Sequence, residues 1–178
     1  YKGANSVEWL AWNLACNSLG GIWVPMYHNQ SDDYCNHIVN DCSPKLFITD
    51  QNPKLETNMK IIHNDIEPKQ YEEIDAIQND VSTLIYTSGT TGKPKGVMLS
   101  NENIISNIKD IQTRFPDLKN RTCLNILPWA HIYSQTCELY YDVINDNKIA
   151  LCSTRENFIK ELKEIQPDVL YVVPRVLE

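Results

Sequence analysis

The stretch from Ser88 to Met98, SGTTGKPKGVM, constrains this chain more than any other. It places three glycines, three hydroxyl side chains and two lysines in eleven residues, one residue after the apolar run Leu84-Ile85-Tyr86. Glycines let successive backbone N–H groups turn towards one point, and hydroxyl and ammonium groups complete a cradle for phosphate oxygens. The pattern therefore predicts a loop that binds a polyphosphate.

This loop differs from the P-loop of nucleoside triphosphatases, which needs G-x-x-x-x-G-K-[ST] and opens a helix. Gly89 and Gly92 are separated by only two residues, and Pro94 follows Lys93. Proline lacks an N–H and pushes the residue before it towards extended geometry, so a helix starting at Lys93 is disfavoured. We predict strand, loop, strand, with the second strand at Val97-Met98-Leu99. A solvated glycine-rich hairpin turn is the alternative, but it suits a shorter connection better.

Helical and strand patterns alternate along the rest of the chain. Val7, Leu10 and Leu14 recur at helical spacing and predict a first helix, with Asn5 as part of its cap. The order of the elements predicts parallel strands joined by crossover helices, and hence an α/β fold: a layered, largely parallel sheet with helices on both faces. Further helices are predicted after Ser31, Ser100 and a Ser153–Glu156 capping box, and strands at residues 22–26, 45–49, 59–63, 123–127, 148–152 and 169–173.

Composition excludes several classes of protein. With 178 residues, 42% of them hydrophobic, the chain can bury a core, and its net charge of -7 argues against a nucleic-acid binder. Six cysteines without a C-x-x-C pair indicate reduced thiols, and Cys35 with His37 is more typical of helix packing than of a metal site. No run of about 18 apolar residues and no signal pattern occurs, which predicts a soluble segment. The missing initiator Met and the ending at Glu178 lead us to expect a fragment of a longer chain.

Several segments resemble the adenylate-forming enzymes, which comprise acyl-CoA synthetases, adenylation domains of peptide synthetases and luciferases. YTSGTTGKPKGV, from Tyr86 to Val97, is similar to their signature phosphate loop. LPWAHIYSQ, from Leu127 to Gln135, resembles a later block of the family in the form typical of long-chain fatty acyl-CoA synthetases. The segments LACNSLGGIWVPMY and IQPDVLYVVPRVLE are similar to further parts of these enzymes. The resemblance implies that residues 1–178 are part of the N-terminal AMP-binding domain, without the C-terminal domain.

The resemblance implies an AMP-forming long-chain fatty acid–CoA ligase that uses ATP, Mg²⁺ and CoA. A fatty acid carboxylate attacks the α-phosphorus of ATP, pyrophosphate leaves, and the CoA thiol then attacks the acyl-adenylate. Such an enzyme is expected inside the cell, in the cytoplasm or at the cytoplasmic face of a membrane. Peripheral membrane contact through regions outside these 178 residues is a further possibility. The alternatives are an adenylating enzyme for an amino or aryl acid, and a relative that binds nucleotide or acyl ligand without turnover.

The resemblance also implies roles for individual residues. Trp129, His131 and Tyr133 are expected to contact the acyl substrate, although His131 could instead be a helix-start histidine satisfied by backbone carbonyls, and the aromatic residues could be core. No catalytic residue is expected within the 178 residues, because the later motifs of the family, including its catalytic lysine, have no counterpart before Glu178. The expected triphosphate-binding residues are Thr87, Ser88, Gly89, Thr90, Thr91, Gly92 and Lys95. Thr91 is also expected to bind the Mg²⁺ ion.

Overall fold

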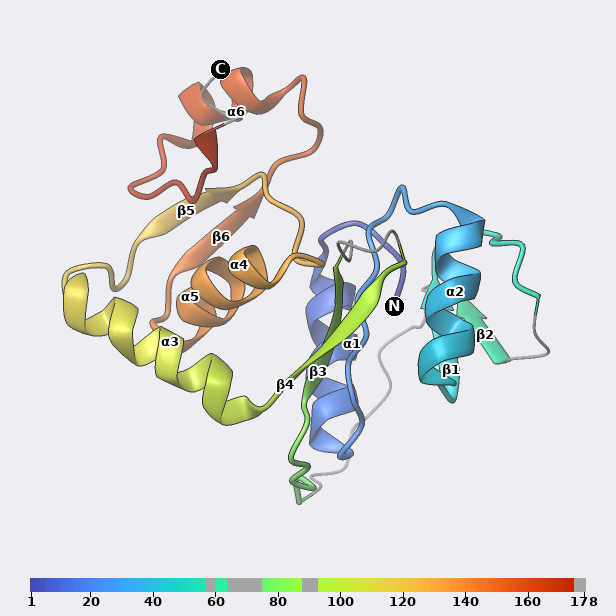
Figure 1. Ribbon diagram of the computed structural model, residues 1–178. Helices are drawn as coiled ribbons and strands as arrows, with labels where there is room; N and C mark the ends of the chain where they lie inside the picture. Colours follow the sequence, from blue (N-terminus) through green and yellow to red (C-terminus); the bar gives the residue numbers. More distant parts are fainter. Residues whose placement is uncertain (57–59, 64–74, 88–92, 175–178) are drawn as a thin grey trace. The chain divides into compact units, whose positions relative to one another are not determined.

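The chain forms two compact units, Tyr1–Asn101 and Glu102–Glu178. The computed structural model describes residues 1–56, 60–63, 75–87 and 93–174 (Figure 1). Each unit has its own hydrophobic core, so each is described by itself.

The first unit is built on a largely parallel sheet. Strand β1 (Leu46–Thr49) pairs in parallel with β2 (Lys60–His63), and β3 (Thr83–Thr87) pairs in antiparallel with β4 (Lys95–Leu99). Parallel bridges join these pairs: Lys2 bridges Thr49 and Met26, and Trp23 bridges Thr83. The sheet therefore runs from β2 through β1, the chain start and residues 23–26 to β3 and β4.

Helices pack on both faces of this sheet. Helix α2 (Asp32–Cys42) buries Ile38 and Val39 in one core with Met26. Helix α1 (Val7–Ser18) places the ring of Trp9 edge-on against that of Trp23, with a centroid distance of 5.0 Å. Side chains alternate between the faces of extended backbone, so Trp23 and Met26 point to opposite faces. This arrangement confirms the predicted layered α/β fold.

The burial of α1 differs from the prediction. Its buried residues are Trp9 and Asn13, whereas Val7 and Leu14 are 74% and 50% exposed within the described structure. The N-cap is Ser6, whose hydroxyl accepts a hydrogen bond from the Trp9 amide, and not Asn5. The large ring of Trp9 buries more apolar area than either aliphatic side chain, so the aromatic cluster sets which face of the helix turns inward.

The second unit contains a smaller parallel sheet and a helical core. Strand β5 (Thr122–Asn125) pairs in parallel with β6 (Lys148–Leu151), and Val169 adds a parallel bridge to Cys123. Helix α3 (Asn101–Arg114) buries Ile104 and Ile108 against this layer, as its apolar spacing predicts. After β6 comes α6 (Phe158–Ile165), whose N-cap is Asn157. Ser153 donates to the Glu161 carboxylate instead of forming the predicted capping box with Glu156.

A continuous helical segment between β5 and β6 was not predicted. It consists of α4 (Ile132–Ser134), a π-helical stretch η1 (Gln135–Tyr140) and α5 (Tyr141–Ile144). The π-helical spacing sets residues five apart close together, and the Gln135 side-chain amide donates to the Tyr140 hydroxyl at 2.8 Å. A pattern search at 3.6 residues per turn misses this segment because the wider turn shifts which residues face inward.

Candidate active site

The glycine loop connects the antiparallel strands β3 and β4. Thr87, the last residue of β3, lies opposite Lys95, the first residue of β4, and both are exposed. The two predicted strands on either side of the glycine loop are confirmed, since the chain continues from Lys95 as a strand and not as a helix. Thr87 and Lys95 therefore lie at the mouth of the loop, on either side. The other predicted phosphate ligands, Ser88, Gly89, Thr90, Thr91 and Gly92, lie outside the described residues.

Helix α2 holds both sides of this hairpin. The Tyr86 hydroxyl, one residue before Thr87, donates to Asp41 Oδ2 at 2.5 Å. On the other side, His37 Nε2 donates to the Pro94 carbonyl oxygen at 3.0 Å, which requires the hydrogen on that ring nitrogen. Burial, followed by the hydrogen bond to Asp41, raises the pKa of Tyr86 and keeps its hydroxyl protonated. The base of the glycine loop is thus fixed from one helix.

Sequence reasoning missed this role of α2. The sequence predicts helix packing for His37, in preference to a metal site, and gives no role to Asp41. The one available signal is their spacing of four residues on a helix, which puts both side chains on one face. That spacing does not say which segment the face contacts.

The block from Leu127 to Gln135 runs from the end of β5 into the helical segment. Trp129 is 3% exposed, so it lies in the interior of the second unit, whereas Tyr133 is 39% exposed. His131 is exposed and forms the N-cap of α4. Its Nδ1 accepts a hydrogen bond from the Tyr133 amide at 3.2 Å.

This hydrogen bond fixes the tautomer of His131. A ring nitrogen that accepts cannot carry a hydrogen, so the neutral imidazole carries its hydrogen on Nε2. His131 does start a helix, but its ring accepts from a backbone N–H instead of donating to backbone carbonyls. The second ring nitrogen is therefore a hydrogen-bond donor suited to a carboxylate or carbonyl oxygen.

A buried polar cluster lies directly behind this block; we call it the Leu127 clamp. It comprises the Leu127 carbonyl group and the side chains of Asn125, Ser134 and Glu138. Asn125 Nδ2 lies 2.9 Å from the Leu127 oxygen and 2.8 Å from Glu138 Oε1. Ser134 Oγ lies 3.2 Å from the Leu127 oxygen and 2.6 Å from Glu138 Oε2. Asn125, Ser134 and Glu138 are 3%, 1% and 0% exposed, so water does not compete for these bonds.

A second buried carboxylate lies one turn further along the helical segment. Asp142 accepts hydrogen bonds from the Tyr171 hydroxyl at 2.9 Å, the Asn147 amide at 2.7 Å and the Cys123 thiol at 2.9 Å. Burial raises the pKa values of both carboxyl groups, and that of Glu138 to about 7. Hydrogen bonds from Ser134 and Asn125 oppose the shift of Glu138, and the charge of Asp142 adds to it.

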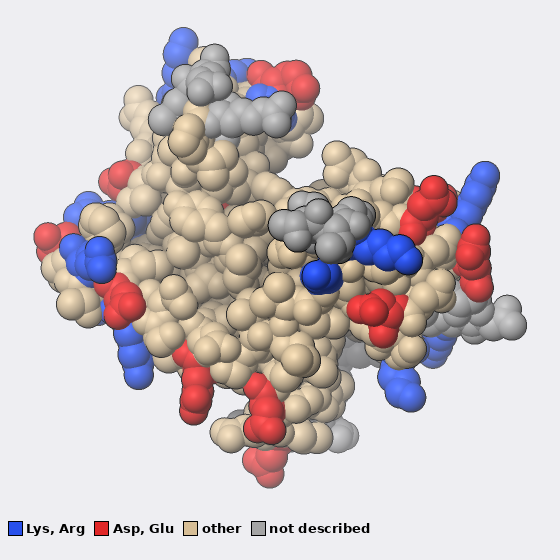
Figure 2. Space-filling view, in the orientation of Figure 1, with Lys and Arg blue, Asp and Glu red and all other residues tan. Residues whose placement is uncertain are grey.

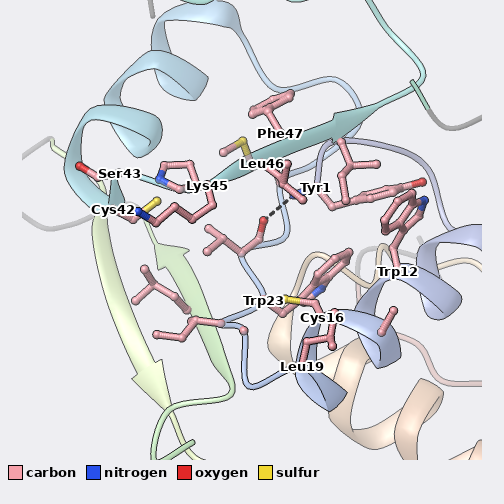
Figure 3. A pocket seen from close by; sticks show the side chains of 18 residues that line it. Tyr1, Trp12, Cys16, Leu19, Trp23, Cys42, Ser43, Lys45, Leu46 and Phe47 are labelled. Carbon is pink, nitrogen blue, oxygen red and sulfur yellow. Dashed lines mark hydrogen bonds between the residues drawn. The ribbon is translucent and has the colours of Figure 1, made fainter. Parts of the chain in front are cut away.

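The first unit also contains an apolar pocket of about 440 Å³ (Figure 3). At its edge the Tyr1 amino group donates to the Val24 carbonyl oxygen at 2.9 Å. No predicted site residue within the described part of the chain lines this pocket, so we do not assign the acyl chain to it. Its walls come from α1, residues 21–26, the segment 42–48 and β3, with Trp12, Leu19, Trp23, Leu46 and Phe47 among the largest side chains.

The described residues contain no cluster of three or more His, Cys, Asp or Glu side chains that could hold a metal ion. Cys35 is fully buried in the core, and all six cysteines, each within the described ranges, are free thiols. On the described surface shown in Figure 2, Lys and Arg side chains lie among Asp and Glu side chains. None of the described helices is long and apolar enough to cross a membrane.

Comparison with known proteins identifies the family. The model of the AMP-binding enzyme family, described as "AMP-binding enzyme", matches residues 3–178. The chain therefore belongs to this family, which confirms the expected membership of the adenylate-forming enzymes. It is 28% identical to the long-chain-fatty-acid–CoA ligase ACSBG1 of Rattus norvegicus over 219 aligned residues, covering 99% of this chain and 30% of that protein.

Solved structures share the fold. O-succinylbenzoate coenzyme A synthetase (MenE) from Bacillus subtilis, in complex with AMP, superposes with a TM-score of 0.85 at 24% identity, over 99% of this chain and 49% of that chain. A further structure of MenE, with ATP and magnesium ion, gives a TM-score of 0.84. Fatty acyl-adenylate ligase from L. pneumophila, with acyl adenylate and pyrophosphate, gives 0.73 at 25% identity, over 91% of this chain and 31% of that chain. The chain thus spans less than half the length of these proteins.

Proposed function

We propose that the full-length protein containing this chain activates a long-chain fatty acid with ATP and transfers it to CoA. The observation that carries the proposal is the hairpin that sets Thr87 opposite Lys95 at the mouth of the glycine loop, in a chain that matches the AMP-binding family over residues 3–178. The 28% identity to a long-chain-fatty-acid–CoA ligase over 99% of the chain supports the choice of acid. The 178 residues alone are not expected to complete the reaction.

The triphosphate of ATP binds at the glycine loop in this proposal. Thr87 and Lys95, with Ser88, Gly89, Thr90, Thr91 and Gly92, contact its phosphate oxygens. Phosphoryl chemistry asks a protein mainly for alignment and for positive charge on the oxygens of the leaving group, and hydroxyls with an ammonium group supply both. The carboxylate attacks the α-phosphorus, and the bond to pyrophosphate breaks as the acyl-adenylate forms.

Magnesium fits this site only when it binds together with the nucleotide. Mg²⁺ prefers oxygen ligands and keeps several waters and phosphate oxygens around it. Among the described residues the loop offers the Thr87 hydroxyl and no acidic cluster, so ATP would supply most of the ligands; Thr91, outside the described residues, would supply one hydroxyl. When bound, the ion would neutralise charge on the phosphates.

The acid binds beside the block from Leu127 to Gln135. His131 donates from Nε2 to an oxygen of the carboxylate, and subsequently of the acyl-adenylate. Tyr133 is half-exposed next to it and suited to contact the acyl chain, while Trp129 shapes the block from inside. We place the enzyme inside the cell, in the cytoplasm or at the cytoplasmic face of a membrane.

The test is carboxylate-dependent ATP–pyrophosphate exchange by the full-length protein. Long-chain fatty acids, short acids, aryl acids and amino acids are compared at equal concentration. Exchange driven by long-chain acids, followed by acyl-CoA formation when CoA is added, supports the proposal. Exchange driven only by aryl or amino acids moves the protein to another substrate class, and ATP binding without any exchange makes it a non-catalytic relative.

A further inference from the structure

Whether every hydrogen bond of the Leu127 clamp can form depends on the protonation state of the Glu138 carboxyl group. Ser134 has one hydroxyl hydrogen but two acceptors in reach, the Leu127 oxygen at 3.2 Å and Glu138 Oε2 at 2.6 Å. If Glu138 is ionised, that hydrogen serves only one of them. If Oε2 carries a proton, Glu138 donates to Ser134 Oγ, and Ser134 donates to Leu127. The two Asn125 amide hydrogens satisfy the remaining contacts in both states.

The clamp acts on the turn that presents His131. The Leu127 carbonyl directly precedes this turn, which is closed by a hydrogen bond from the His131 amide to the Pro128 oxygen at 3.0 Å. On the far side, the Gln135 amide donates to the His131 oxygen at 2.9 Å, so the helical segment that carries Glu138 starts at the same residue. Both ends of the turn are therefore tied to the clamp.

We propose that Glu138 is a positioning residue for His131: its protonated carboxyl completes the Leu127 clamp and thereby sets the place of the imidazole that binds the acid. The inference rests on the proposed function, because it concerns the acid site of that reaction. Glu138 itself touches no substrate in this account.

The electrostatic surroundings of Glu138 make the clamp sensitive to pH near neutrality. Its burial raises the pKa of the carboxyl to about 7, so its protonation changes between about pH 6 and pH 8. The Asp142 charge adds to this shift, while the hydrogen bonds from Asn125 and Ser134 oppose it. The titratable groups that face Glu138 are Cys123 on β5, Tyr133 on α4 and Asp142 on α5.

The experiment compares Glu138→Ala, Glu138→Gln and a matched control, Asp142→Asn, in the full-length protein. Asp142 is equally buried on the same helical segment, but its hydrogen bonds go to Cys123, Asn147 and Tyr171 and not to Leu127. KM values for palmitate and for ATP are measured by pyrophosphate exchange from pH 6 to 8. Hydrogen exchange of the amides at residues 127–134 is measured without substrates, so that it reports the clamp independently of activity.

We expect Glu138→Ala to raise the KM for palmitate about tenfold, with a much smaller change for ATP, and to speed amide exchange at residues 127–134. Glu138→Gln should rescue both, because its amide can donate to Ser134 at every pH, and it should flatten the pH dependence of the palmitate KM. The Asp142→Asn control should leave the palmitate KM at the wild-type value at pH 6, and, because it removes a charge that raises the Glu138 pKa, it should move the midpoint of the pH dependence to lower pH. If Glu138→Ala does not fold, the pH profile of Glu138→Gln still decides.

Three results would overturn the inference. Unchanged exchange at residues 127–134 in Glu138→Ala would show that the clamp does not hold the turn. Faster amide hydrogen exchange in Glu138→Ala with an unchanged KM for palmitate would show that the position of the turn does not affect binding of the acid, while the proposed function stands. A Glu138→Gln variant with the wild-type pH profile would show that Glu138 protonation is irrelevant. Absence of carboxylate-dependent exchange in the wild type would instead contradict the proposed function and the acid-site role with it.

Discussion

The glycine-loop hairpin and the block from Leu127 to Gln135 are held in place in different ways. The hairpin is held from outside, by His37 and Asp41 on one face of α2. The block is held from inside, by buried carboxyl, amide and hydroxyl groups. A loop that binds and releases pyrophosphate needs only a fixed base, whereas a residue that orients a carboxylate needs a fixed side chain.

The largest loss of stability is expected from removing the other buried carboxylate of the second unit, Asp142, which lies outside the Leu127 clamp. Asp142→Ala leaves the buried Tyr171 hydroxyl and Cys123 thiol without their acceptor and removes one of the two acceptors of the Asn147 amide. We expect a loss of about 3 to 5 kcal/mol in the free energy of opening the second unit. Native-state hydrogen exchange of the full-length protein measures this directly. A loss below about 1 kcal/mol would mean that the cluster does not hold the unit together.

A substitution at the exposed mouth of the hairpin should lower the rate of the reaction and leave the stability of the protein unchanged. Lys95→Ala removes an ammonium group from the proposed phosphate site, and we expect kcat/KM for ATP to fall about 100-fold. Because Lys95 is exposed, the melting temperature should remain within about 1 °C. The neighbouring Lys93→Ala is the matched control, and an equal fall in both variants would argue for general charge instead of a specific contact.

The stability of the second unit should depend on pH through the protonation of Glu138. Glu138 has a folded-state pKa of about 7, above its ordinary value near 4.5, so the fold favours the protonated form. Its contribution is fully present below about pH 4.5 and is lost as pH rises through 7. Relative to Glu138→Gln, the wild type should lose about 2 to 3 kcal/mol of opening free energy in the second unit over that range. Hydrogen exchange at several pH values measures the difference, and a constant difference would contradict the assignment.

The smallest effect is expected at the base of the hairpin. Tyr86→Phe removes the hydrogen bond to Asp41, whose carboxylate is exposed and can bind water instead. We expect a loss of about 1 kcal/mol in stability and a modest rise in the KM for ATP. Tyr34→Phe on α2 is a control of the same chemistry away from the loop. A 100-fold effect at Tyr86 would mean that α2 contributes to the phosphate site itself.

The two regions also differ in how far the sequence predicts them. The glycine loop is visible in the sequence because the phosphate binding that we propose for it requires particular residue types at consecutive positions, and Pro94 disfavours a helix after Lys93. The strands on either side follow from their apolar runs. His131 stands out for the same reason, since it lies in a recognisable block.

The supports of both regions escape sequence reasoning. Ser134 and Glu138 lie four residues apart, at ordinary helical spacing, but nothing in the sequence shows that Asn125, at the end of β5, meets Glu138 in the interior. The face of α1 was mispredicted because the packing of Trp9 against Trp23 depends on tertiary contacts. Local patterns report residues that meet a ligand or solvent; they do not report which distant residues meet each other in the interior.

The central claim is that the hairpin binds the nucleotide and the block from Leu127 to Gln135 binds the acid. One measurement tests it most directly: KM values for ATP and for palmitate in Lys95→Ala and His131→Ala variants of the full-length protein, by pyrophosphate exchange. The account predicts opposite selectivity, with Lys95→Ala raising mainly the KM for ATP and His131→Ala mainly the KM for palmitate. Equal changes in both constants in both variants would contradict it.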